Sequence, residues 1–128
     1  MAYIKSYEMK GVSIAPPYAR VLKILASPET PKMKTEHLVF GISIIAAKSK
    51  TEKHGHEGTD ECIYVVTGRG EAEVAGKKIK LEPDIAFLIR PGEQHQIFNH
   101  YDEPMKLIWV YAPPGAQKQF LANVKKVT

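Results

Sequence analysis

Three histidines and one glutamate stand at spacings typical of metal ligands. His54 and His56 are two residues apart, and Glu61 follows after a segment of turn composition, Glu57–Asp60. If His54 and His56 lie on a β-strand, their side chains point to one face and sit about 6–7 Å apart. Two imidazoles at that separation can reach one ion, since bonds from a metal such as zinc to nitrogen measure about 2.0–2.1 Å. The pair therefore predicts one side of a metal site.

Glu61 and His95 are the candidates for the other side of this site. Glu61 opens an apolar run, Cys62–Val66, which predicts a buried strand. A carboxylate at the mouth of a buried strand is costly unless it is paired or bound to a metal. His95 follows the turn at Pro91-Gly92 and begins another predicted strand. The four side chains meet if the two strands face each other.

The order and spacing of these residues resemble the two sequence motifs of the cupin superfamily. The matching residues are His54-x-His56-x4-Glu61-x6-Gly68 for the first motif and Gly92-x2-His95-x3-Asn99 for the second. The resemblance covers about residues 40–115, and no ligand position is altered.

Three positions depart from the family pattern. Lys48 stands where the first motif begins with glycine, Asp84 where the second opens with glycine, and Arg90 where the second has a proline. Aspartate tolerates the left-handed conformation that glycine supplies in a turn. Lysine is less easily accommodated, so the sequence does not predict the family's turn at Lys48.

Short apolar runs separated by turn residues predict an all-β fold. Strands are expected at Arg20–Ala26, Leu38–Ala46, Cys62–Val66, Glu71–Val74, Lys77–Leu81, Ile85–Ile89, from His95 onward, and Met105–Tyr111. For Arg20–Ala26 a short helix is the alternative, and the strand is favoured. The resemblance implies a double-stranded β-helix, the jelly-roll cupin barrel. We expect one domain over residues 1–128 with its barrel core at about 36–115, an extended N-terminal arm and a short C-terminal helix at Gln117–Val124.

Composition limits the classes of function. The net charge of +4 comes from scattered lysines rather than a basic cluster with stacking aromatics, which argues against a nucleic-acid partner. No apolar run approaches the length of a membrane span, and the first ten residues lack the apolar core of a signal peptide. We therefore expect no membrane partner and a cytoplasmic protein. Cys62, the single cysteine, is expected to be a small buried hydrophobe.

The ligand set and the resemblance together imply a metal-binding protein. Three imidazoles and a carboxylate suit one divalent Mn, Fe, Co, Ni, Cu or Zn ion, and the sequence does not choose among them. The first hypothesis is a metalloenzyme that acts on a small oxygenated metabolite (a carboxylate, enol or sugar acid) by dioxygenase, decarboxylase or isomerase-type chemistry. The alternatives are a non-catalytic cupin that binds or senses a small molecule, and a cupin whose ion only stabilises the barrel.

Other residues are weaker candidates, for substrate contacts and for assembly, and none is assigned as catalytic. Trp109 and Tyr111 share a strand face and are expected either to line the pocket or to serve as core aromatics. Arg90 is a candidate to clamp a substrate carboxylate, with an ordinary surface arginine as the alternative. The apolar N-terminal arm, which includes Tyr3 and Tyr7, predicts a homodimer in which the arms pair across a two-fold axis.

Overall fold

The structure is a computed structural model that describes residues 1–118. Within these residues a short 3₁₀ helix, η1 (Ser6–Glu8), precedes nine strands. The strands are β1 (Val12–Ile14), β2 (Arg20–Ala26), β3 (Val39–Ile45), β4 (Asp60–Thr67), β5 (Gly70–Val74), β6 (Lys77–Leu81), β7 (Ala86–Ile89), β8 (His95–Phe98) and β9 (Met105–Ala112). Residues 116–118 are helical, and the rest of the helix expected at Gln117–Val124 lies outside the described residues. No helix within residues 1–118 is long and apolar enough to cross a membrane.

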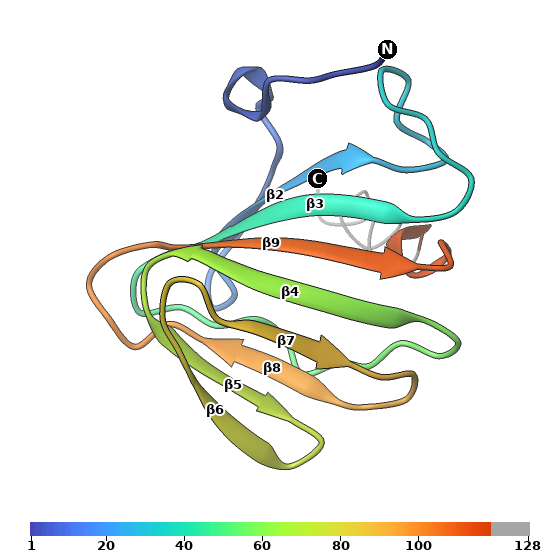
Figure 1. Cartoon of the computed structure of the whole chain (residues 1–128). Helices are drawn as coiled ribbons and strands as arrows, with labels where there is room; N and C mark the ends of the chain where they lie inside the picture. The colour runs from blue at the N-terminus through green and yellow to red at the C-terminus, as the bar shows by residue number, and fades with distance from the viewer. Residues whose placement is uncertain (119–128) are drawn as a thin grey trace.

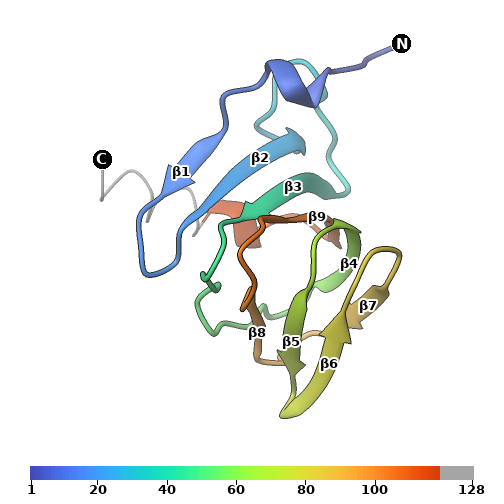
Figure 2. The same cartoon turned by 90° about the vertical axis from the view of Figure 1, so that its left-hand side faces the viewer.

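The strands pair in an antiparallel manner and form two sheets. The larger sheet has the order β1-β2-β3-β9-β4-β7, and the smaller sheet has the order β6-β5-β8. The two sheets face each other across a common interior (Figures 1 and 2). Two facing antiparallel sheets are the architecture of a jelly roll, so the predicted fold class is confirmed.

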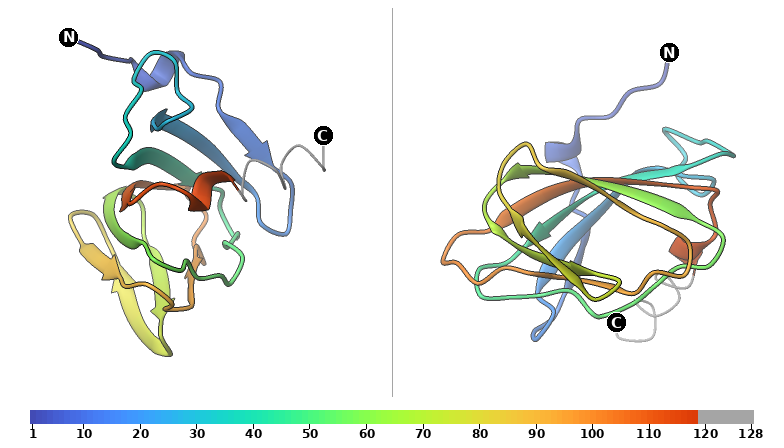
Figure 3. Two further views of the ribbon diagram at one scale, coloured as in Figure 1. Left: turned by 90° about the vertical axis from the view of Figure 1, so that its right-hand side faces the viewer. Right: turned by 60° about the horizontal axis from the view of Figure 1, so that its bottom comes forward.

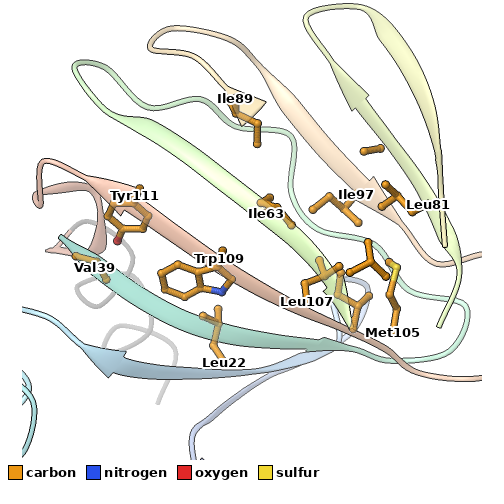
Figure 4. Packing of buried hydrophobic residues seen from close by; sticks show 13 residues of the cluster. Leu22, Val39, Ile63, Leu81, Ile89, Ile97, Met105, Leu107, Trp109 and Tyr111 are labelled. Atoms are coloured by element: carbon orange, nitrogen blue, oxygen red, sulfur yellow. The ribbon is translucent and has the colours of Figure 1, made fainter. Parts of the chain in front are cut away.

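The core lies between the sheets and combines side chains from both. Ile63 and Leu107 of the larger sheet are gathered with Leu81 and Ile97, which come from β6 and β8 (Figure 4). Each of these four side chains is at most 5% exposed. Fully burying an aliphatic side chain contributes about 1.5–3 kcal/mol. This shared core therefore holds together the two sheets that carry the candidate ligands.

Alternation along β4 and β9 decides which side chains enter the interior. In β9, Leu107, Trp109 and Tyr111 are buried while the residues between them are more exposed. In β4, Glu61 and Ile63 are buried and their neighbours are exposed. A period of two is expected of strands with one buried face. Glu61 is therefore directed into the barrel by the same register that buries the apolar residues of its strand.

Lys48 and Asp84 adopt the backbone conformation of the glycines that the family pattern has at their positions. Their φ angles are 58° and 73°, in the left-handed region. The Lys48 ammonium donates to the carbonyl of His100 at 2.8 Å, and the Lys48 backbone N–H donates to the carbonyl of Tyr101 at 3.0 Å. The turn at Lys48 thus forms without a glycine, and two hydrogen bonds tie it to the loop after β8.

The N-terminal arm is mostly extended, and its first residues project from the barrel (Figure 3). Tyr3 and Tyr7 are 69% and 77% exposed. Further along the chain, Val12–Ile14 pair with Arg20–Leu22 of β2. The short connection through Pro16-Pro17 allows this pairing.

Cys62 is exposed, which corrects the expectation that it is buried. It points away from Glu61, because adjacent strand residues face opposite sides. The outer face of the larger sheet also exposes Tyr64 and Leu88, at 41% and 42%. The described chain leaves this face of the sheet in contact with solvent, so an apolar residue here is not part of the core.

Candidate metal centre

His54, His56 and His95 converge in the interior of the barrel. One ring nitrogen of each histidine lies within 4.8 Å of those of the other two. The ring centroids are 4.9 Å apart for the 54–56 pair, 4.2 Å for the 54–95 pair and 5.5 Å for the 56–95 pair. Ligand atoms bound to one ion at about 2.1 Å lie about 3–4 Å from one another. The separations of up to 4.8 Å are somewhat longer than this, so a small inward rotation of the rings would let the three nitrogens share one ion.

The His-x-His pair does not lie on the continuous strand that the sequence suggested. His54 forms an isolated antiparallel bridge with His95, in which each backbone N–H donates to the other residue's carbonyl, at 3.0 and 2.8 Å. His56 lies in the loop that follows, where its carbonyl accepts a bond from the Gly92 N–H at 2.7 Å. These contacts hold the pair against the start of β8 without strand pairing along its length.

Two backbone carbonyls orient the imidazoles. The Nδ1 atom of His54 lies 2.9 Å from the carbonyl oxygen of Glu52, and the Nδ1 atom of His95 lies 3.3 Å from that of Glu93. Because a carbonyl only accepts hydrogen bonds, Nδ1 carries the proton in both rings and Nε2 keeps its lone pair. Nε2 is therefore the nitrogen with which each ring can bind an ion.

Glu61 approaches the histidines from the larger sheet. Its strand neighbours are Tyr111 of β9 and Ile89 of β7. Its Oε1 atom lies 3.6 Å from Nε2 of His56 and 3.5 Å from Nε2 of His95. This buried oxygen has no hydrogen-bond partner among the described residues. A buried polar atom without a partner is costly, and an ion shared with the histidines would supply the partner.

Burial pushes the acid and the bases of this cluster toward their neutral forms. It raises the pKa of the Glu61 carboxyl to about 7. Burial, together with the nearby charge of His54, lowers the pKa of His95 to about 4 and lowers the pKa of His56 as well. Neutral imidazole is the form that binds a metal, and a bound cation favours the ionised carboxylate. The residues present therefore fit a divalent ion.

The four residues share one cavity of about 110 Å³ with a mainly apolar wall. Trp109 and Tyr111 belong to this wall, and their rings stack with centroids 5.4 Å apart and planes at 8°. The ring of His56 also stacks on that of Tyr111, with the two centroids 5.9 Å apart. Cavities for drug-sized ligands measure about 300–1,000 Å³, so this cavity suits a smaller molecule.

Two residues of β3 fix the position of the Trp109 side chain. Its indole N–H donates to Oγ of Ser43 at 2.9 Å. Gly41 lies directly under the ring, where an added Cβ atom would come within 2.6 Å of Cη2 of the indole. Real Cβ atoms do not approach so closely. The glycine therefore leaves room for the indole to lie close to β3, where it forms part of the cavity wall.

Arg90 does not line the cavity. It is exposed, in the turn before β8, and its backbone N–H donates to Oε1 of Glu93 at 2.7 Å. The structure instead places Arg20 in the cavity wall, with 8% of its surface exposed. Arg20 was not singled out from the sequence. The alternation along β2 could have revealed it, because Arg20 shares the inward face of the strand with Leu22. Arginine is rarely buried, so a buried arginine indicates a specific role.

Gln117 was also missed. It is 2% exposed and lines the cavity beside Tyr111, whose hydroxyl donates to Gln117 Oε1 at 3.4 Å. The same oxygen accepts from the Gly115 N–H at 2.7 Å, and Nε2 donates to Glu29 at 3.3 Å. This glutamine fixes the segment after β9 against the barrel. A lone glutamine near the end of a sequence carries no motif that would reveal such a position.

The fold and the cavity define the class of protein, a small jelly-roll barrel whose interior carries a cluster of three histidines and a carboxylate. A sequence model of the Cupin domain matches residues 41–111, which is more than half of the chain. The chain belongs to the cupin family.

The chain shares part of its sequence with proteins of known name from other organisms. The chain is 29% identical over 72 residues to the tetracenomycin polyketide synthase protein TcmJ of Streptomyces glaucescens, a match that covers 56% of this chain and 48% of that protein. It is 26% identical over 84 residues to L-ectoine synthase of Aliivibrio fischeri, a match that covers 64% of this chain and 66% of that protein. The chain thus spans between about half and two thirds of the length of these relatives.

The fold is also similar to that of KdgF from Halomonas sp. The TM-score is 0.75 at 21% sequence identity, and the match covers 92% of this chain and 98% of that one. At this identity the likeness shows the fold.

Proposed function

We propose that the protein binds one divalent transition metal ion through His54, His56, Glu61 and His95 and acts on a small oxygenated metabolite in the adjoining cavity. The observation that carries this proposal is the convergence of the three imidazoles with an unpartnered carboxylate oxygen. The ring nitrogens lie within 4.8 Å of one another, and Oε1 of Glu61 is 3.5–3.6 Å from two of them. Mn, Fe, Co, Ni, Cu and Zn all accept this set of donors.

Four protein ligands leave positions open on a six-coordinate ion. An ion held there would polarise an oxygen of the substrate or activate a small molecule, which is the basis of dioxygenase, decarboxylase and isomerase-type chemistry. The chain itself would orient the imidazoles through the carbonyls of Glu52 and Glu93. The stacked rings of Trp109 and Tyr111 would orient the substrate against a flat apolar wall. A carboxylate, an enol or a sugar acid fits this setting.

The similarity to relatives named for polyketide and ectoine synthesis supports a role in the conversion of metabolites. The match covers only part of each relative, so their reactions are not transferred. Metal-dependent turnover of a small carboxylate, enol or sugar acid would support the enzyme. Binding of such a compound with no turnover under iron, manganese, nickel or zinc would instead support a binding or sensor protein.

Elemental analysis tests the metal site directly. We expect about one equivalent of a transition metal in protein purified without added metal, and its loss in His95→Ala. His37→Ala is the matched control, because His37 is exposed and does not line the cavity; it should keep the metal. The absence of metal from the wild-type protein, even after reconstitution, would contradict the proposal.

We also propose that the protein is a homodimer in which the N-terminal arm takes part. The exposure of Tyr3 and Tyr7 supports this arrangement, because two large aromatic side chains are left in solvent by the described chain. The single domain over residues 1–128 and the cytoplasmic location stay predictions from the sequence.

A further inference from the structure

A buried arginine lies in the wall of the cavity that holds the proposed metal ligands. Arg20 opens β2, opposite Ile45 of β3, and its side chain is 6% exposed. Leu22 follows on the same inward face and also lines the cavity. Among the described residues that line this cavity, Arg20 is the one side chain that is cationic at every physiological pH.

The protein uses only part of the guanidinium of Arg20. A guanidinium has five N–H donors in a fixed fork. Within residues 1–118, Nη1 donates to the carbonyl of Tyr18 at 3.0 Å and Nη2 donates to Oε2 of Glu52 at 2.7 Å. Glu52 does not line the cavity, and its side chain is 42% exposed. The guanidinium therefore bonds outward to Glu52 and keeps N–H groups that a ligand in the cavity can use.

The charges around the cavity favour an anionic ligand. A divalent ion held by the three imidazoles and Glu61 would more than offset the single negative charge of that carboxylate. Arg20 adds a further positive charge in a mainly apolar wall, where charge pairs are stronger than in water. A ligand with negative oxygens would meet both the ion and the guanidinium.

We propose that Arg20 binds a carboxylate of the substrate, which makes the substrate a small carboxylic acid with a second oxygen group that reaches the metal. This inference rests on the proposed function and specifies its substrate class. The planar fork of arginine matches a carboxylate with two parallel hydrogen bonds. Arg20 thus takes the role for which the sequence suggested Arg90.

A purely structural role for Arg20 makes a different prediction. The Arg20–Glu52 pair also joins β2 to the segment that carries His54, since the Glu52 carbonyl accepts a bond from His54. If the only role of Arg20 is to form this structural ion pair, then removing either partner should have the same effect on ligand binding. If Arg20 binds the ligand, the Glu52 carboxylate competes with the ligand for the guanidinium. Removing Glu52 should then leave ligand binding unchanged or make it tighter.

The test compares Arg20→Gln and Glu52→Gln by calorimetric titration of the Mn²⁺-loaded protein with malonate. We expect Arg20→Gln to weaken malonate binding by about tenfold or more, as charge-assisted bonds of this kind imply. Glu52→Gln should bind malonate as tightly as the wild type or more tightly. The affinity for Mn²⁺ is measured separately for each variant, so that malonate binding is compared at equal occupancy of the metal site. Arg20→Lys, which keeps the charge but loses the fork, should fall between the wild type and Arg20→Gln, and it serves if the glutamine variant does not fold.

If both glutamine variants weaken malonate binding equally, the inference is overturned and Arg20 has only a structural role in the ion pair with Glu52. An unchanged affinity in Arg20→Gln, or no malonate binding by the wild type, would also overturn it. Failure of the wild type to bind Mn²⁺ or any other transition metal would instead overturn the proposed function. The same malonate titrations on the metal-free protein would then decide the role of Arg20. Malonate affinity that falls only in the Arg20 variants supports the carboxylate site, and any other result overturns it.

Discussion

Glu61 is the residue that most destabilises the metal-free form of the protein. Its carboxyl is buried at the end of β4, and Oε1 has no hydrogen-bond partner among the described residues. Burial raises its pKa from 4.5 to about 7. Without an ion the ionised form is destabilised, and with an ion it gains its missing partner. The same atom should therefore destabilise the metal-free protein and stabilise the metal-bound one.

This double role predicts opposite effects of Glu61→Gln in the two states. At pH 8 the metal-free variant should be more stable than the metal-free wild type by about 1–3 kcal/mol, since each unit of pKa shift corresponds to about 1.4 kcal/mol. Its affinity for metal should fall, because the amide is a weaker ligand than the carboxylate. Urea unfolding in the presence of a chelator measures the first effect, and metal titration measures the second.

The pH dependence provides the control. Because the folded pKa of Glu61 is raised, the folded wild type keeps a proton between pH 4.5 and 7 that the unfolded chain has lost. This contribution to stability is complete below pH 4.5 and is lost as the pH rises to 7. The advantage of Glu61→Gln should thus vanish near pH 4.5 and be full above pH 7. A metal-free variant that is less stable than the wild type at pH 8 would contradict the role assigned to Glu61.

The sequence was sufficient to bring Glu61 and the three histidines into one hypothesis, because their spacing is a local property that a motif records. It did not reveal Arg20, since a single arginine at the start of an apolar run does not show which face of the sheet it occupies. Arg90 attracted attention because it stands beside the second motif. Its turn instead leaves the side chain in solvent.

Strand positions were predictable for a similar reason. β2 coincides with the predicted Arg20–Ala26, and β3 lies within Leu38–Ala46, because alternation and turn residues act locally. The pairing of β3 with β9, far along the chain, depends on the whole barrel. His54 and His56 were considered on a strand, but this pair makes only one isolated bridge, at His54.

The turn after β3 offers a test of how the chain replaces a glycine. Lys48 holds φ at 58°, which is unfavourable for a residue with a Cβ atom. Lys48→Gly and Lys48→Ala both remove the bond to the His100 carbonyl, but only glycine relieves the backbone. We expect the glycine variant to be more stable than the alanine variant by about 1 kcal/mol. Chemical denaturation of the two variants measures this difference. Equal stabilities would mean that the left-handed turn is not retained in solution.

A bound ion would join the two sheets. Glu61 belongs to the larger sheet, whereas His95 belongs to the smaller one and holds His54 at its edge. Removal of the metal should therefore lower the melting temperature of the whole barrel. Metal at a hundred times its dissociation constant stabilises by about 2.7 kcal/mol, which for a chain of this size corresponds to about 10 °C. Calorimetric scans with and without chelator should show this shift in the wild type and in His37→Ala, and not in His95→Ala. A similar shift in His95→Ala would place the stabilising ion elsewhere.

The proposed homodimer can be assigned to one of two exposed apolar surfaces. The first is the N-terminal arm, where a bond of 2.8 Å from Lys23 to the Ser6 carbonyl anchors η1 while Tyr3 and Tyr7 remain exposed. The second is the outer face of the larger sheet, which exposes Tyr64 and Leu88. The two surfaces lie on different parts of the chain, so paired substitutions can separate their contributions.

We expect light scattering to give twice the mass of one chain for the wild type. Replacement of Tyr3 and Tyr7 by serine should yield the monomer, because an arm without its aromatic side chains loses most of the apolar area that pairing would bury. The matched replacement of Tyr64 and Leu88 by serine should leave the dimer intact. Retention of the metal by both variants would show that the barrel is folded. A monomeric wild type would refute the dimer, and dissociation only by the second pair of substitutions would move the interface from the arm to the sheet.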